Sequence, residues 1–101
     1  MNEKIERLRA LIEKDTTERF VKQGYTDMSV HFDSGIKTTV KPGKKYTKVD
    51  VGRSGKYMID HETGEIFGIK GYGVIHRGHK FGTLDTIDEW FWGEYQAVKK
   101  A

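Results

Sequence analysis

The chain has 101 residues, 18 of them basic and 15 acidic, with a formal net charge of +3 and no cysteine. This length is enough for one compact domain with a modest core, so we expect a single domain over residues 1–101. The lack of cysteine excludes disulfides, thiolate chemistry and cysteine-ligated zinc. No apolar run is long enough for a signal-peptide core or a membrane span, so we expect a cytoplasmic protein that makes no contact with membranes.

The N-terminal segment predicts an amphipathic helix from Asn2 to about Gln23, ended by Gly24. Residues of one face recur at helical spacing: Ile5, Leu8, Ile12, Thr16 and Phe20. The run Asp15-Thr-Thr-Glu18 also fits a capping box, which would break this helix near Thr16 and begin a second one. We favour one continuous helix.

The period becomes strand-like from Tyr25 to His76, where β-branched and aromatic residues alternate with turn-forming residues. Short turns such as Lys41-Pro-Gly43 and His61-Glu-Thr-Gly64 require antiparallel neighbours. We expect a curled meander of five or six short strands near Asp27–Phe32, Ile36–Lys41, Tyr46–Val51, Lys56–Asp60, Glu65–Ile69 and Tyr72–His76.

A second helix is predicted at the C-terminus because apolar residues again follow helical spacing: Leu84, Ile87, Phe91, Tyr95 and Val98. Thr86 with Glu89 forms a capping-box pattern, and Asp85 and Asp88 lie where the helix dipole favours acidic residues. The fold class is then α+β, with an N-terminal helix, an antiparallel meander and a C-terminal helix, both helices covering one side of the sheet.

Two residues of this predicted C-terminal helix need explanation. Gly93 in a helix interior costs about 1 kcal/mol relative to alanine, and Trp92 points away from the apolar stripe. An outward tryptophan beside a glycine allows close approach of another chain, although a tolerated packing compromise predicts the same residues. Trp92 is therefore a candidate contact for a protein partner.

Positive charge is concentrated between Ile36 and Lys56, where seven basic residues face only Asp50, a local balance of +6. Tyr46 and Tyr57 lie within or beside this segment, a composition typical of a nucleic-acid-binding surface. Two later cations complete the candidate site for nucleic acid or a protein partner: Lys37, Lys41, Lys44, Lys45, Lys48, Arg53, Lys56, Arg77 and Lys80. The alternative is a solvated sheet face whose lysines prevent edge-to-edge aggregation.

The run His76-Arg-Gly-His79 is the only local cluster with catalytic character. A metal site needs a further ligand, and the nearest carboxylate in sequence is Asp85, so we expect no metal. If the protein is an enzyme, His76 and His79 are its acid–base pair on a phosphodiester, which requires that they converge with Arg77. A phosphate-contacting glycine loop is a further alternative. The simplest interpretation of Lys70–Thr86 is a tight, curved turn that leads into the last helix.

Glycine-rich nucleotide motifs do not fit this chain. Gly71-Tyr-Gly73 and the glycines after it lack the spacing of a dinucleotide-binding fingerprint, and Gly52-Arg-Ser-Gly-Lys56 lacks the length and terminal hydroxyl residue of a P-loop. We therefore expect no nucleotide cofactor.

Residues 46–87, through the runs SGKYM, TGEIFGIKGYG and HRGHKFGTLDT, resemble a group of small orphan proteins encoded by bacteriophages and related mobile elements. The resemblance covers about two-fifths of the chain and carries no catalytic residues onto it. It implies an accessory protein in a bacterial host cell that binds nucleic-acid machinery, including inhibitors of host defence. The combined expectation is a non-enzymatic binding module that engages nucleic acid or inhibits a host nucleic-acid-handling protein.

Overall fold

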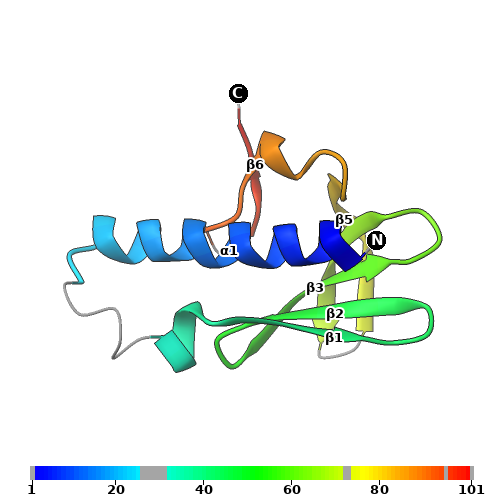
Figure 1. Cartoon of the computed structure of the whole chain (residues 1–101), viewed down its shortest axis with the longest axis horizontal. Coiled ribbons are helices and arrows are strands. Elements are labelled where there is room, and N and C mark those ends of the chain that lie inside the picture. The colour runs from blue at the N-terminus through cyan, green and yellow to red at the C-terminus, as the bar shows by residue number, and fades with distance from the viewer. Residues whose placement is uncertain (1, 26–31, 72–73, 95, 101) are drawn as a thin grey trace.

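The computed structural model describes residues 2–25, 32–71, 74–94 and 96–100. β1 to β5 form one antiparallel sheet in chain order, β6 pairs with β7, and one long helix lies across the large sheet (Figure 1). The elements are α1 (Asn2–Lys22), a π-helical turn (Phe32–Ile36), β1 (Thr38–Pro42), β2 (Tyr46–Val51), β3 (Ser54–Asp60), β4 (Glu65–Gly71), β5 (Val74–Thr83), a 3₁₀ helix (Ile87–Glu89), β6 (Trp90–Phe91) and β7 (Val98–Lys99). The α+β class, the N-terminal helix and the antiparallel meander are confirmed.

The strand expected over Asp27–Phe32 falls outside the described residues except for Phe32, which opens the π-helical turn. β1 begins two residues later than expected and includes Pro42. A proline is tolerated there because β1 is the first strand of the sheet order and therefore an edge strand.

α1 is one continuous helix, as its periodicity predicts. Ile5, Leu8 and Ile12 are 6%, 1% and 0% exposed against the sheet. The hydroxyls of Thr16 and Thr17 donate to the carbonyls of Ile12 and Glu13 at 2.7 and 2.8 Å, one turn earlier in the same helix. Because these hydroxyls bond backward and do not cap a new N-terminus, the helix continues through Thr16 to Lys22.

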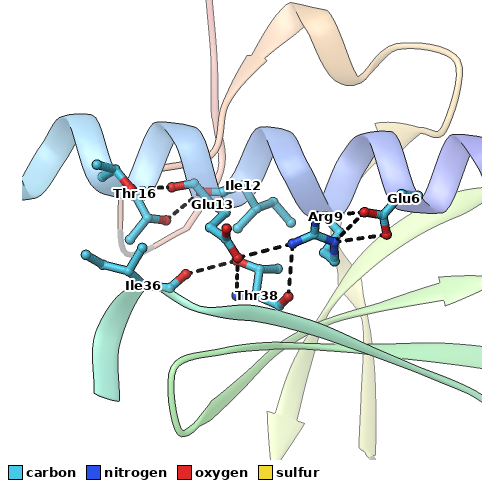
Figure 2. A network of polar contacts seen from close by, with 8 residues as sticks. Glu6, Arg9, Ile12, Glu13, Thr16, Ile36 and Thr38 are labelled. Atoms are coloured by element: carbon cyan, nitrogen blue, oxygen red, sulfur yellow. Dashed lines mark hydrogen bonds and ion pairs between the residues drawn. The ribbon is translucent and has the colours of Figure 1, made fainter. Parts of the chain in front are cut away.

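Two carboxylates of α1 hold the segments on either side of the helix. Glu13 Oε2 accepts hydrogen bonds from the Thr38 backbone N–H at 3.0 Å and from Arg9 Nη1 at 3.1 Å (Figure 2). Asp15 Oδ2 accepts the backbone N–H of Trp92 at 2.9 Å. The first contact ties α1 to the edge strand β1, and the second ties it to the C-terminal segment.

The main core lies between α1 and one face of the large sheet, called here the inner face. Val49, Ile59 and Ile66 of β2, β3 and β4 are each 0% exposed on this face. The Tyr57 ring lies edge-on to Phe81 and Trp92, with centroids 5.5 and 5.3 Å apart. Rings of β5 and of the segment that contains Trp92 therefore close this side of the core.

The predicted C-terminal helix is wrong: residues 87–89 form a 3₁₀ helix and short strands follow it. Thr86 does not cap a helix, because its hydroxyl accepts the backbone N–H of Thr83 at 3.0 Å. Asp85 and Asp88 form ion pairs with Lys4 and Arg7 of α1. These two acidic residues therefore form ion pairs with a distant segment of the chain, and they do not lie at the start of a helix as predicted.

The outward position predicted for Trp92 is also wrong. Its side chain is 1% exposed, and its Nε1 donates to the carbonyl of Ile87 at 2.9 Å. A Cβ on the neighbouring Gly93 would lie 2.3 Å from the carbonyl oxygen of Asp15. The glycine does allow close approach, but of α1 in the same chain. Trp92 is therefore a core residue and offers no surface to a partner.

The glycine-rich stretch Lys70–Thr86 is not the tight turn that its composition indicates. Its central part is the ten-residue strand β5. Phe67 pairs with Lys80 while the next residue, Gly68, pairs with His76, so three residues of β5 bulge out of the ladder. Gly78 and Gly82 of this stretch therefore lie in a bulged strand and not in a turn.

Replacing Gly93 by alanine tests the packing of the C-terminal segment on α1. Because the new methyl group meets backbone atoms that cannot rotate away, Gly93→Ala should lower the free energy of unfolding by about 3 kcal/mol, measured by urea denaturation with tryptophan fluorescence. Gly71→Ala is the matched control, since no atom lies within 4 Å of its new Cβ, and it should change stability by less than about 0.5 kcal/mol. Equal stability of both variants would contradict this packing.

Candidate nucleic-acid interface

The sheet face that points away from α1, called here the outer face, carries a continuous row of cross-strand partners. Lys41, Lys48, Met58, Phe67 and Lys80 pair in this order from β1 to β5. With strands about 4.8 Å apart, the row spans about 19 Å. Met58 and Phe67 are each 4% exposed, so the row has lysines at its ends and a closed apolar centre.

Arg77 lies over this centre. Its guanidinium carbon is 5.3 Å from the ring centroid of Phe67 and 5.9 Å from that of Tyr46, and Nη2 donates to the Tyr46 hydroxyl at 2.5 Å. Lys45 Nζ lies 5.5 Å from the same Tyr46 centroid. Two cations thus share one tyrosine ring, an arrangement stabilised by the negative face of the ring.

Three carboxylates lie among these cations. Lys41 pairs with Asp50 at 3.1 Å, Lys80 with Glu65 at 2.7 Å, and Arg77 lies 3.9 Å from Asp60. The cationic side chains are 52–56% exposed, whereas those of Asp50, Asp60 and Glu65 are 13%, 7% and 26% exposed. The face is therefore partly neutralised, but its solvent-facing charges are the positive ones.

The remaining predicted cations do not all join this face. Lys44 and Lys45 are exposed in the β1–β2 connection, beside Tyr46. Lys37 and Arg53 are exposed at the opposite end of β1 and β2, where the N–H of Gly52 donates to the carbonyl of Lys37 at 2.7 Å. The nine predicted residues therefore do not form a single surface.

Lys56 lies on the inner side of the sheet, which simple alternation along β3 does not predict. Asp50 pairs with Gly55 and Val49 pairs with Tyr57, so Lys56 is the extra residue of a β-bulge. It lines a cavity together with Arg19 of α1. Burial and, second, the nearby Arg19 charge lower the pKa of the Lys56 ammonium from its usual value.

His76 and His79 converge on each other but not on Arg77. Their rings stack with centroids 4.0 Å apart and planes inclined by 14°, and His76 Nδ1 accepts the backbone N–H of Gly78 at 3.2 Å. A Cβ on Gly68, an inner-face position, would lie 3.2 Å from the His79 Cβ, whereas Arg77 lies over Phe67 on the outer face. The convergence of both histidines with Arg77, which the enzyme alternative requires, is therefore not present in this structure.

No protein-family model matches the chain, and no curated protein or solved structure matches it significantly. Across the described ranges, no group of three or more histidine, cysteine or acidic side chains is placed to hold a metal ion. No helix in that part of the chain has the length and apolar composition needed to span a membrane.

The sequence alone indicates neither the carboxylates that pair with the cations of the outer face nor the position of Arg19 near Lys56. Cross-strand register places Asp50 diagonal to Lys41, but register is visible only once strand ends are known. Nothing in the sequence distinguishes Arg19, since an arginine late in an amphipathic helix is ordinary. Its proximity to Lys56 depends on the bulge in β3.

The Lys80–Glu65 pair gives a pH test of the outer face. The hydrogen bond from Lys80, and second that from Thr63, lower the pKa of Glu65. The contribution of the pair to stability is therefore complete above the unfolded-state pKa of Glu65 and disappears as the pH falls through its lower folded-state pKa.

Lys80→Met should raise the pKa of Glu65 toward its usual value, as measured by carboxyl carbon chemical shifts during a pH titration. Lys48→Met, which lies three strands from Lys80 and two strands from Glu65, should leave the Glu65 pKa as it is in the wild type. Identical Glu65 titration curves in wild type and Lys80→Met would show that the ion pair is not formed in solution.

Proposed function

We propose that this chain is a binding module for single-stranded nucleic acid, with the outer sheet face as its docking surface. The observation that carries the proposal is the row from Lys41 to Lys80 across all five strands, with Arg77 lying over its apolar centre. The resemblance of residues 46–87 to small phage-encoded proteins supports the further proposal that the ligand is met in the cytoplasm of a bacterial host.

The charge arrangement supports binding of a polyanion. Phosphates are attracted by exposed lysines and arginines, and each contact releases condensed counterions. On the outer face the paired carboxylates are largely covered while the cations reach the solvent. Lys44 and Lys45, which have no carboxylate beside them in the adjoining turn sequence, extend the positive charge beyond Tyr46.

The position of Arg77 favours a single strand over a duplex. Arginine guanidinium groups stack on aromatic rings and on unstacked nucleic-acid bases. The Arg77 side chain lies near the Phe67 and Tyr46 rings and is 55% exposed, so it can reach a base of a bound strand. Unstacked bases are available in single strands but not within a duplex.

Binding is favoured over catalysis by the geometry of the two histidines. An acid–base pair needs room for a substrate between its two groups. The His76 and His79 rings are stacked against each other at 4.0 Å, and Arg77 is turned to the other face of the sheet. A phosphodiester-processing site centred on these histidines would require rearrangement of β5.

Fluorescence anisotropy with a labelled single-stranded 20-mer of DNA or RNA tests the proposal. If four cations of the outer face each contact a phosphate, affinity should fall about 50-fold between 50 and 200 mM salt. Lys48→Gln and Lys80→Gln should each weaken binding at low salt and reduce the slope of log affinity against log salt by about 0.7. Lys14→Gln, on an exposed position of α1, is the matched control and should bind like the wild type.

Two results would overturn the proposal. Unchanged anisotropy of single-stranded probes at 50 mM salt would exclude the nucleic-acid function. Equal weakening by Lys14→Gln and Lys48→Gln would show non-specific attraction to the whole protein and not a docking face. If host lysate instead yields a stable protein complex that Lys48→Gln abolishes, the outer face binds protein and the nucleic-acid proposal is wrong.

A further inference from the structure

The bulge of β5 is closed by the imidazole of His76. Arg77, Gly78 and His79 are the residues that leave the ladder between His76 and Lys80. His76 Nδ1 accepts the backbone N–H of Gly78 at 3.2 Å, and the His76 ring stacks on the His79 ring with centroids 4.0 Å apart. A Cβ on Gly78 would lie 3.0 Å from His76 Cε1, so the imidazole lies directly against this backbone. His76 therefore contacts both bulge residues that follow Arg77.

The same bulge sets the position of Arg77. Its guanidinium carbon lies 5.3 Å from the Phe67 centroid and 5.9 Å from the Tyr46 centroid, and Nη2 donates to the Tyr46 hydroxyl. The extra residues of a bulge are left out of the ladder, so their conformation depends on other contacts. Because His76 supplies such contacts, it holds the guanidinium over the two rings.

Only the neutral form of His76 can make the hydrogen bond with Gly78. An accepting Nδ1 carries no proton, whereas both nitrogens of an imidazolium are donors. Protonation of His76 would therefore place a ring N–H against the N–H of Gly78. A second charge on the stacked His79 ring would add repulsion. Imidazole is the side chain that ordinarily changes charge between about pH 5 and 8.

The groups around the two histidines do not neutralise an imidazolium. The adjoining elements carry cations and uncharged polar groups: Arg77 and Lys80 of β5, Lys70 of β4, Lys56 and Tyr57 of β3, and Gln96 of the C-terminal segment. The carboxylates of these strands, Asp60 and Glu65, face Arg77 and Lys80 on the outer side. Among the residues that the structure describes, no carboxylate forms an ion pair with either histidine.

We infer that neutral His76 is a positioning residue for Arg77 and makes nucleic-acid binding by the outer face dependent on pH. The effect on binding rests on the proposed function, whereas the movement of Arg77 does not. As the pH falls from about 7.5 to about 5.5, His76 takes up a proton and its hydrogen bond with Gly78 breaks. The bulge then opens, and Arg77 leaves the Phe67 and Tyr46 rings.

NMR spectroscopy of the protein without nucleic acid tests the position of Arg77. At about pH 7.5, nuclear Overhauser effects should join its side chain to the ring protons of Tyr46 and Phe67, and they should disappear toward about pH 5.5 together with the titration of the His76 ring. His76→Asn is the conservative variant, because an Asn side chain accepts the N–H two residues later without taking up a proton. It should keep these contacts at both pH values. His76→Leu, which has no acceptor, should lose them at both.

Binding of a labelled single-stranded oligonucleotide at constant ionic strength gives the functional readout. Wild-type affinity should fall about fivefold or more between about pH 7.5 and 5.5, the loss expected when one base no longer stacks. Added positive charge alone would instead strengthen binding. Glu65 stays ionised over this range, because the hydrogen bond from Lys80 lowers its pKa. His76→Asn should show no such fall, whereas His79→Phe, which keeps a ring against His76, should show the wild-type fall.

Contacts of Arg77 with the two rings that persist at the lower pH in the wild type would overturn the inference. A fall in affinity that remains in His76→Asn would also overturn it, and would point to another imidazole such as His61, whose Nε2 lies 2.6 Å from the Thr47 hydroxyl. If no oligonucleotide binds at any pH, the proposed function fails, but the NMR titration still decides the role of His76. If His76→Leu does not fold, the wild type and His76→Asn still decide it.

Discussion

The position of α1 on the sheet is the constraint on which the rest of the structure depends. Two carboxylates two residues apart fix it: Glu13 accepts the N–H of Thr38 in the edge strand, and Asp15 accepts the N–H of Trp92 in the C-terminal segment. One helix thereby positions both the edge strand β1 and the C-terminal segment that contains Trp92. Because this helix covers one face of the sheet, the lysines of alternating positions are left on the other face.

Local irregularities of the strands determine where the charges go. The bulge in β3 removes Lys56 from the outer row, and the larger bulge in β5 separates Arg77 from the two histidines beside it in sequence. Arg77 then covers Phe67 and Tyr46, while Lys56 approaches Arg19. The basic residues of one sequence segment are thus divided between two faces of the sheet. On the outer face they are exposed and partly neutralised by carboxylates, and on the inner face Lys56 lines a small cavity.

Much of the fold follows from sequence periodicity. The N-terminal helix is predicted correctly because its regularly spaced apolar residues Ile5, Leu8 and Ile12 are the ones that pack in the core. The strand expected over Tyr46–Val51 is found as β2 with the same bounds. These elements are long or strongly alternating, so local pattern and tertiary packing agree. The site is less predictable. The sequence indicates the basic strands, but ion pairs with Asp50, Asp60 and Glu65 depend on register, and the position of Lys56 depends on a bulge.

The C-terminal helix failed as a prediction for a specific physical reason. Leu84 and Ile87 have helical spacing and both are buried in the core, but the backbone there forms only a three-residue 3₁₀ helix, Ile87–Glu89. The N–H of Trp92 bonds to Asp15 and not to a carbonyl one helical turn earlier, and Gly93 fits against the backbone of α1. Tertiary contacts of this kind override local propensity and are invisible without the partner segment.

The most direct test is a chemical-shift map of the protein with an unlabelled single-stranded oligonucleotide at low salt. The structure predicts perturbed amides along the row Lys41, Lys48, Met58, Phe67 and Lys80 and at Arg77, with α1 and β6 unaffected. Perturbations centred on α1, or none at all on the five strands, would contradict the assignment of the outer face as the docking surface.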